Sequence, residues 1–259
     1  MRAWRAWRRR RLLACARIDA GLWARVTAAI PCLHGLDDAE QARLRDLASL
    51  FLREKRILGA GGFEPDEEAR AAIAAQACLP VLALDADLLG GWRTVLVYPG
   101  AFLSRQHEVD EAGVVTEWED ERSGEAWPEG PLVLSWEEAR PGAEPYGEGS
   151  NVVIHEIAHK LDQRTGEANG LPPLHRDMDP QAWARVMSAA YERLRRRVAR
   201  GRATAVDPYA AEDPGEFFAV VSEHFFCAPW LLLEEMPEVY RELSRFYRQE
   251  PARRLLRSR

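Results

Sequence analysis

Chemistry-bearing side chains gather in one short run of the sequence, His155-Glu156-Ile157-Ala158-His159. Around it, residues 152–161 are apolar on almost every side apart from these three polar residues and Lys160, which predicts a helix buried inside the protein. Two histidines four positions apart lie on the same face of a helix and can both bind one metal ion. The HExxH pattern therefore predicts a zinc site in which Glu156 takes a proton from a bound water molecule.

A protein without metal would have to satisfy the same two histidines through hydrogen bonds to other groups. Two imidazoles and a carboxylate are costly to bury inside an apolar helix unless each of them finds a partner. A metal ion satisfies both imidazoles at once, so the zinc site is the favoured interpretation.

Two histidines do not complete a catalytic zinc site, which normally has three protein ligands and a water molecule. The metzincin pattern needs Gly at position 162 and His at position 165, and the chain has Asp162 and Thr165 instead. The third ligand must therefore come from further along the chain. Glu216 and Glu223 are the candidates, because they are seven positions apart in a helical segment and share one face.

The residue pattern leaves the role of each candidate open. Glu216 also fits a capping box, with Asp213 as the N-cap residue and Pro214 at the first helical position. For Glu223, a solvated carboxylate or a hydrogen-bond partner of a ligand histidine is favoured over ligation. Asp162 shares a face with His159 and could either orient a ligand imidazole or form a surface ion pair.

The composition excludes several classes of protein. The chain has 259 residues, of which 47% are hydrophobic and 29% charged, which is typical of a globular protein rather than a disordered one. A net charge of −6 argues against direct binding of nucleic acid, and no apolar run reaches the roughly 18 residues of a membrane helix. The first dozen residues are rich in arginine, but the apolar run that follows is too short for export, so we expect a cytoplasmic protein.

The four cysteines are scattered along the chain and form no CxxC pair. Cys15, Cys32, Cys78 and Cys227 match neither a structural zinc site nor a disulfide framework. We interpret them as small buried side chains in a reducing compartment.

Periodicity and turn signals predict helices at both ends of the chain and strands in the middle. We expect helices over residues 37–55, 65–78 and 180–200, strands over 94–98 and 132–136, a weaker strand over 114–116, and a loop or wide hairpin over 117–130. Ser150 is the expected cap of the HExxH helix. Glycines and prolines between residues 141 and 149 suggest a boundary. The predicted parts are a basic extension (1–30), an α/β lobe that contributes strands (31–148) and a helical zinc-binding catalytic lobe (149–259).

Dispersed motifs make the chain similar to a known family. The matching runs are residues 155–162, Asn169-Gly170-Leu171-Pro172, Tyr209-Ala210-Ala211, 214–220, Ser222-Glu223, Gly62-Phe63-Glu64, 78–82, Val97-Tyr98-Pro99, 130–136 and 246–251. Through these runs, the sequence resembles the zinc peptidases typified by Mlc titration factor A over roughly residues 30 to 251, and more distantly the catalytic domain of anthrax lethal factor. The resemblance implies an α+β, zincin-like metallopeptidase with a small mixed sheet and surrounding helices.

The resemblance also implies specific roles. It makes Glu216 the third ligand of a single Zn²⁺ held by His155 and His159, with Glu156 as the general base. Tyr209 lies seven residues before Glu216, at the family position of a tyrosine that donates to the oxyanion. The alternative for Tyr209 is an aromatic side chain that packs in a loop.

The expected function is therefore zinc-dependent hydrolysis of peptides, of the aminopeptidase type that the resemblance implies. The resemblance further implies binding to a transcription repressor of the Mlc type. An alternative is a regulatory protein that sequesters such a repressor, with the metal site secondary. A toxin-like endoprotease is disfavoured, because nothing indicates export. The strand over residues 132–136 is either an edge that pairs with an extended peptide or an ordinary interior strand.

Overall fold

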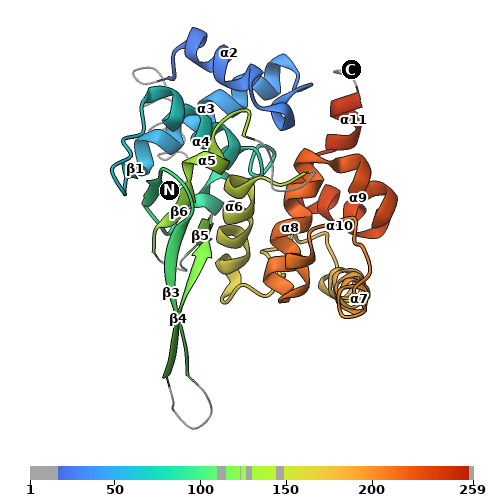
Figure 1. Cartoon of the computed structure of the whole chain (residues 1–259). Helices are drawn as coiled ribbons and strands as arrows, with labels where there is room; N and C mark the ends of the chain where they lie inside the picture. Colours follow the sequence, from blue (N-terminus) through green and yellow to red (C-terminus); the bar gives the residue numbers. More distant parts are fainter. Residues whose placement is uncertain (1–16, 110–114, 123, 127–129, 144–148, 257–259) are drawn as a thin grey trace.

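A four-stranded mixed sheet and the helices packed around it make up most of the molecule (Figure 1). The structure, a computed structural model, describes residues 17–109, 115–122, 124–126, 130–143 and 149–256. Its helices are α2 (Ala20–Ala28), α3 (Asp38–Glu54), α4 (Glu67–Cys78), α5 (Trp136–Ala139), α6 (Val152–Asp162), α7 (Pro180–Val198), α8 (Pro214–Cys227), α9 (Pro229–Glu235), α10 (Pro237–Tyr247) and α11 (Pro251–Leu256), with short 3-10 turns η1 (Pro31–Leu33), η2 (Ala86–Leu89), η3 (Gln163–Thr165) and η4 (Pro208–Ala211). Its strands are β1 (Arg56–Gly59), β2 (Thr94–Tyr98), β3 (Phe102–Val109), β4 (Val115–Arg122), β5 (Gly124–Ala126) and β6 (Leu132–Ser135).

The sheet has the order β1-β2-β6-β5. Strands β1, β2 and β6 run parallel, and β5 pairs antiparallel with β6, with Gly124 opposite Leu134. Val95, Val97, Leu132 and Leu134 share one face of the sheet and are fully buried, whereas Leu58 on the opposite face is 46% exposed, so the core lies against one face. Strands β3 and β4 form a separate antiparallel hairpin that extends away from the sheet (Figure 1). The predicted α+β, zincin-like class with a small mixed sheet is confirmed.

Helix α6 occupies the centre of the fold, between the sheet and α8 (Figure 1). Its apolar residues Val153, Ile154, Ile157 and Leu161 are fully buried, which is why its sequence is apolar almost all round. They belong to one hydrophobic cluster that runs from Trp23 of α2 through the sheet to the aromatic side chains of α8 and α10. The packing therefore fixes α6 against both the sheet and α8.

The predicted helices over 37–55 and 65–78 are present as α3 and α4, and the first begins with the expected capping box between Asp37 and Glu40. The strands over 94–98 and 132–136 are present as β2 and β6. The helix predicted from residue 180 is α7, and Asp179 caps it.

Two expectations about local structure are wrong, and one open alternative is decided. Residues 117–130 were expected to form a loop or wide hairpin, but most of this stretch belongs to β4 and β5. Of the two alternatives for residues 132–136 the interior strand is observed, because β6 lies between β2 and β5, and β1 and β5 are the outer strands of the described sheet. Asn151, rather than Ser150, caps α6, because its side chain accepts the Ile154 N–H.

The division of the chain near residue 148 stays a prediction, and residues 144–148 and most of the basic N-terminal segment lie outside the described residues. Among the described helices, none combines the length and the apolar character that a bilayer crossing requires.

Candidate metal centre

Helix α6 brings the two histidines of the HExxH run together. The Asn151 side chain accepts a hydrogen bond from the Ile154 N–H at 3.0 Å and so fixes the first turn of the helix. One turn later, His155 and His159 point their rings to the same side, and their Nε2 atoms lie 3.1 Å apart. Their rings meet edge to face, with centroids 4.8 Å apart. The predicted pair of imidazole nitrogens is therefore convergent.

Glu216 lies opposite this pair, on the first turn of α8. Its Oε2 atom lies 3.1 Å from His155 Nε2 and 3.3 Å from His159 Nε2. Asp213 alone caps the helix, by accepting the Gly215 and Glu216 N–H groups at 2.7 and 2.9 Å. Because the Glu216 carboxylate faces the histidines, its position fits the ligand role better than the capping-box role.

The three side chains fit a zinc ion. Their ligand atoms all lie within 4.8 Å of one another, so these three described residues could hold one metal ion together. Ligand atoms about 2.0–2.1 Å from a tetrahedral ion are roughly 3.3 Å apart, close to the spacings observed here. Two imidazole nitrogens and one carboxylate oxygen are also a donor set typical of catalytic zinc, which keeps its fourth position for water.

The electrostatics of the cluster reflect the proximity of these groups. Burial acts to raise the pKa of Glu216, but the two histidines outweigh it and lower that pKa. Burial acts to lower the pKa of His155, and the Glu223 and Glu216 carboxylates raise it well above its usual value. A metal cation at the centre would take the place of the protons that these imidazoles share with the carboxylates.

Glu156 lies beside the cluster and lines the same cavity of about 900 Å³. The carboxyl group is almost fully buried, and its Oε2 atom has no hydrogen-bond partner among the described residues. Burial raises the pKa of Glu156 to about 7, against the opposing effect of His155 and His159. A group with a pKa close to neutral can both accept and release a proton, as a general base and acid must.

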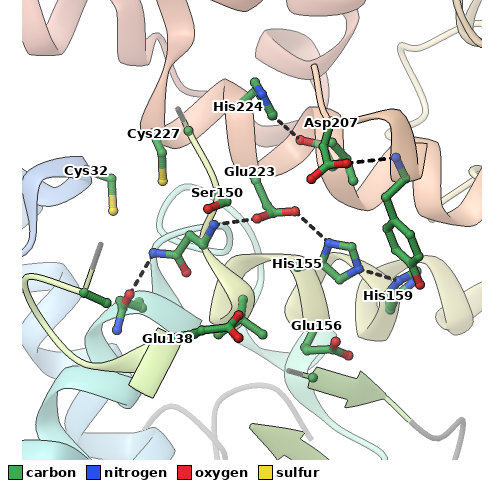
Figure 2. Close-up of a pocket in the computed structure, with 18 of the residues that line it drawn as sticks. Cys32, Glu138, Ser150, His155, Glu156, His159, Asp207, Glu223, His224 and Cys227 are labelled. Atoms are coloured by element: carbon green, nitrogen blue, oxygen red, sulfur yellow. Dashed lines mark hydrogen bonds and ion pairs between the residues drawn. The ribbon is translucent and has the colours of Figure 1, made fainter. Parts of the chain in front are cut away.

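Glu223 contacts the His155 ring through the nitrogen that does not face Glu216 (Figure 2). Its Oε1 atom lies 2.7 Å from His155 Nδ1, and its Oε2 atom accepts the Asn151 N–H. The Asn151 side chain in turn donates to Gln76 Oε1 at 2.7 Å. Of the alternatives for Glu223, the hydrogen-bond partner of a ligand histidine is the one that this geometry matches.

Asp162 has a different environment from either of the two that its sequence position suggested. The side chain is fully buried, which excludes a surface ion pair, and its Oδ2 atom accepts the Gly170 N–H at 2.6 Å. Asp162 therefore fixes the 169–171 turn against the end of α6.

Tyr209 lies in η4, at the mouth of the same cavity. Its side chain is 37% exposed, and its ring centroid is 6.2 Å from that of His155. Asp207 fixes the turn by accepting the Tyr209 N–H at 2.9 Å. The sequence-predicted side chains His155, Glu156, His159, Tyr209 and Glu216 thus come together around one cavity.

Comparison with known proteins agrees with this arrangement. The family model described as "Glucose-regulated metallo-peptidase M90" matches residues 4–248. The chain belongs to this M90 family. Among its relatives, the protein named Mlc titration factor A of Escherichia fergusonii is 41% identical over 235 residues, which cover 89% of this chain and 87% of the relative. The Mlc titration factor A proteins of Salmonella typhi and Salmonella typhimurium are each 40% identical over 232 residues, which cover 88% of this chain and 86% of theirs.

Membership of the M90 family makes the chain a metallopeptidase, and a metallopeptidase needs a metal. The His155, His159 and Glu216 cluster is the group of described residues with the geometry to hold one.

Sequence reasoning missed three residues that contribute to this M90 site. Asn151 and Gln76 extend the hydrogen-bond network behind Glu223, and neither belongs to a motif. Gly124 of β5 lies against Glu156, where a Cβ atom would come within 2.3 Å of Glu156 Oε1 and 2.7 Å of Val152 Cγ2. A glycine within a short strand is a known signal of close approach, but residue 124 was assigned to a loop.

Gly124 offers a test of this close approach. We expect Gly124→Ala to displace the Glu156 carboxyl group and lower kcat by about 10- to 100-fold, because a misplacement of about 1 Å has that order of effect. Zinc content should stay unchanged. Gly21→Ala, on the remote helix α2, is the matched control. Unaltered peptidase kinetics in Gly124→Ala would contradict the packing described here.

Glu223 offers a test of the support behind His155. Glu223→Ala should weaken zinc binding by about 10- to 100-fold, because outer partners of ligand histidines contribute on that order. Competition against a chelator of known affinity measures the change. Glu235→Ala, which removes an exposed carboxylate from α9, is the control. Equal zinc affinity in both variants would mean that Glu223 does not orient His155.

Proposed function

We propose that this M90 protein is a cytoplasmic, zinc-dependent peptidase of the aminopeptidase type. The observation that carries the proposal is the convergence of His155, His159 and Glu216 beside a buried Glu156 in one cavity. In this proposal, the three side chains hold one Zn²⁺ per chain. When bound, zinc would acidify a water molecule and polarise the scissile carbonyl group.

The protein side chains then move the protons. A carboxylate oxygen of Glu156 takes the proton of the attacking water molecule and later gives it to the amine of the leaving product. Its unpartnered Oε2 atom leaves room for that exchange. The Tyr209 hydroxyl, at the cavity mouth, donates a hydrogen bond to the oxyanion that develops on the carbonyl oxygen. Glu223 keeps the His155 ring in one orientation throughout.

Strand β5 gives the substrate a place to bind. As one of the two outer strands of the described sheet, it can pair with an extended peptide by β-addition, and Gly124 would bring that peptide close to Glu156. In this proposal β5 takes the role that the sequence suggested for residues 132–136.

The charge of the cavity supports an aminopeptidase preference. Besides the proposed catalytic and ligand carboxylates, Glu138, Asp207 and Glu212 line the cavity, whereas Arg140 is its one Lys or Arg side chain among the described residues. A negative cavity favours the free ammonium group at a peptide amino terminus over a blocked one.

Tyr209 tests the oxyanion role directly. We expect Tyr209→Phe to lower kcat by about 10²- to 10³-fold with a smaller change in KM, because a donor to the oxyanion contributes mainly in the transition state. Tyr191→Phe, which removes a partly buried hydroxyl that bonds Glu212 O, controls for loss of a phenol group near η4. A Tyr209→Phe enzyme with wild-type kcat would assign Tyr209 to packing alone.

The names of the relatives favour a second candidate function, because Mlc titration factor A is named for a repressor. In this candidate, the chain captures a DNA-binding repressor and does not itself contact nucleic acid or a membrane. Glu156→Gln separates the two functions. If this variant still captures the repressor but no longer cleaves peptides, both functions coexist in one chain.

Hydrolysis of amino-acid anilides and of blocked and unblocked peptides tests the main proposal. Zinc-loaded protein should cleave the anilides and unblocked peptides, and chelation should abolish the cleavage. Equal cleavage of acetylated peptides would reject the aminopeptidase type and leave an endopeptidase. No cleavage by protein that holds one zinc ion would favour the repressor-binding function.

A further inference from the structure

Two cysteines from opposite ends of the chain meet in the wall of the metal-site cavity (Figure 2). Cys32 lies in η1, and Cys227 is the last residue of α8. Their side chains lie near one another in the cavity wall, and each thiol shifts the pKa of the other. Both are free thiols, Cys32 buried and Cys227 partly exposed. Sequence spacing alone gave no reason to pair them.

Helix α8 connects this thiol pair to the metal centre. Glu216, Glu223 and Cys227 follow one another at seven and four positions, so they share the face of α8 that lines the cavity. Glu216 is a proposed zinc ligand and Glu223 contacts the ligand His155. Cys227 lies one turn beyond Glu223. The thiol pair therefore occupies the end of the cavity remote from Glu216, where neither sulfur is needed for the proposed hydrolysis.

The surroundings of Cys32 favour its reactive form. The interaction with Cys227 lowers the pKa of Cys32, and the nearby Arg254 guanidinium acts in the same direction against burial. Arg254 is itself held close by, with its Nη2 atom donating to Cys32 O at 2.8 Å. A cationic neighbour and an adjacent second thiol are the features that distinguish redox-sensitive cysteines from structural ones.

Cys78 provides a contrast within the same protein. It is a fully buried free thiol on α4, and burial raises its pKa. It does not line the cavity. A small oxidant that enters the cavity should therefore react with Cys32 and Cys227 and spare Cys78.

We propose that Cys32 and Cys227 form a redox-active dithiol that a peroxide converts reversibly into an intramolecular disulfide. The Cys32 thiolate attacks one peroxide oxygen, the O–O bond breaks, and Cys32 becomes a sulfenic acid while the other oxygen leaves as water. The Cys227 sulfur then attacks the Cys32 sulfur, the S–S bond forms, and the second oxygen leaves as water. Two thiols lose two electrons in total, and one hydrogen peroxide molecule becomes two water molecules.

The disulfide would join η1 to the end of α8 and close a loop that contains most of the chain. Cross-linking so long a loop restricts the unfolded state strongly, so the oxidised protein should be more stable than the reduced one. In a reducing compartment such a bond forms transiently, as in redox-sensing proteins. The proposal thus adds a modification site to the protein and does not depend on its peptidase activity.

Mass spectrometry of the oxidised full-length protein tests the proposal. The zinc-loaded chain is treated with one equivalent of hydrogen peroxide, free thiols are blocked with N-ethylmaleimide, and the protein is digested with trypsin without reduction. We expect a disulfide between the peptides that contain Cys32 and Cys227, its loss after dithiothreitol, and Cys78 recovered as the maleimide adduct. The thermal midpoint of the oxidised protein should rise by at least about 4 °C.

Single substitutions supply the matched controls. Cys32→Ser and Cys227→Ser should each abolish both the disulfide and the rise in midpoint, whereas Cys78→Ser and Cys15→Ser should keep both. Separate alkylation of Cys32 and Cys227 in the treated wild-type protein would overturn the proposal without any variant. Direct oxidation of either thiol to a sulfinic acid would also overturn the proposal. Binding of a second zinc ion by the wild-type protein, lost in both serine variants, would overturn it as well.

Discussion

Replacing Glu156 with Gln is expected to lower kcat by about 10²- to 10⁴-fold while the protein still binds one zinc ion per chain. The amide keeps the size of the side chain but cannot take a proton from water, and proton transfer by a positioned general base has an effect of this order. Glu156 is not one of the three clustered ligands, so zinc affinity should change little. Steady-state hydrolysis of an unblocked peptide and metal analysis of the same sample measure both quantities.

The choice of control matters, because loss of any carboxylate alters the field of this acidic cavity. Glu137→Gln removes an exposed carboxylate from α5, next to the cavity-lining Glu138, and should leave kcat within about twofold of the wild-type value. A Glu156→Gln protein that retains zinc and wild-type kcat would show that another group takes the proton.

The second large effect is expected at Glu216. Glu216→Ala should weaken zinc binding by more than the roughly 10- to 100-fold expected at Glu223, because a direct ligand contributes more than the group that orients a ligand. Peptidase activity should disappear at stoichiometric zinc. Calorimetric titration of zinc into the metal-free variant measures the loss of affinity.

Asp213 separates the ligand role of Glu216 from the capping role that the sequence left open. Asp213→Ala removes the side chain that accepts the Gly215 and Glu216 N–H groups, so it should cost about 1 kcal/mol of stability and keep zinc. Glu216→Ala should show the reverse pattern, with zinc lost and the metal-free protein almost as stable as wild type. If Glu216→Ala destabilises α8 but retains zinc, Glu216 is a capping residue and the third ligand lies elsewhere.

Local sequence signals predicted those features of the site that depend on one helix alone. The HExxH spacing placed His155 and His159 on one face of α6, because four positions correspond to about one helical turn. Asp213 and Pro214 marked the start of α8 in the same way. The sequence alone could not choose between the two uses of Glu216, since that choice depends on how α8 packs against α6. Resemblance to a family favoured the ligand role, and the packing agrees with it.

The errors about strands have a common physical origin in long-range pairing. Residues 117–122 are mostly charged and resemble a loop, but β4 has all its residues paired with β3, so backbone hydrogen bonding determines the strand there. Strand β1 has only four residues, too few to give a periodic pattern, and pairs with β2. Which strand lies at the edge of a sheet also depends on pairing order, which is why the sequence left open whether residues 132–136 form an edge or an interior strand.

The cysteines illustrate the same limit. Cys32 and Cys227 carry no motif, and the contact between them exists because α8 packs against η1. Spacing along the chain indicates metal or disulfide sites only where the ligands come from one or two neighbouring elements.

Zinc titration of the metal-free protein, followed by peptide hydrolysis, tests whether His155, His159 and Glu216 hold a catalytic zinc ion. We expect activity to be absent without metal, to rise in proportion to added zinc and to stop rising at one ion per chain. We also expect His155→Ala and His159→Ala to remain inactive throughout the titration. Full activity of the metal-free protein, or a saturating activity that survives loss of both histidines, would contradict the assignment of the metal to His155, His159 and Glu216.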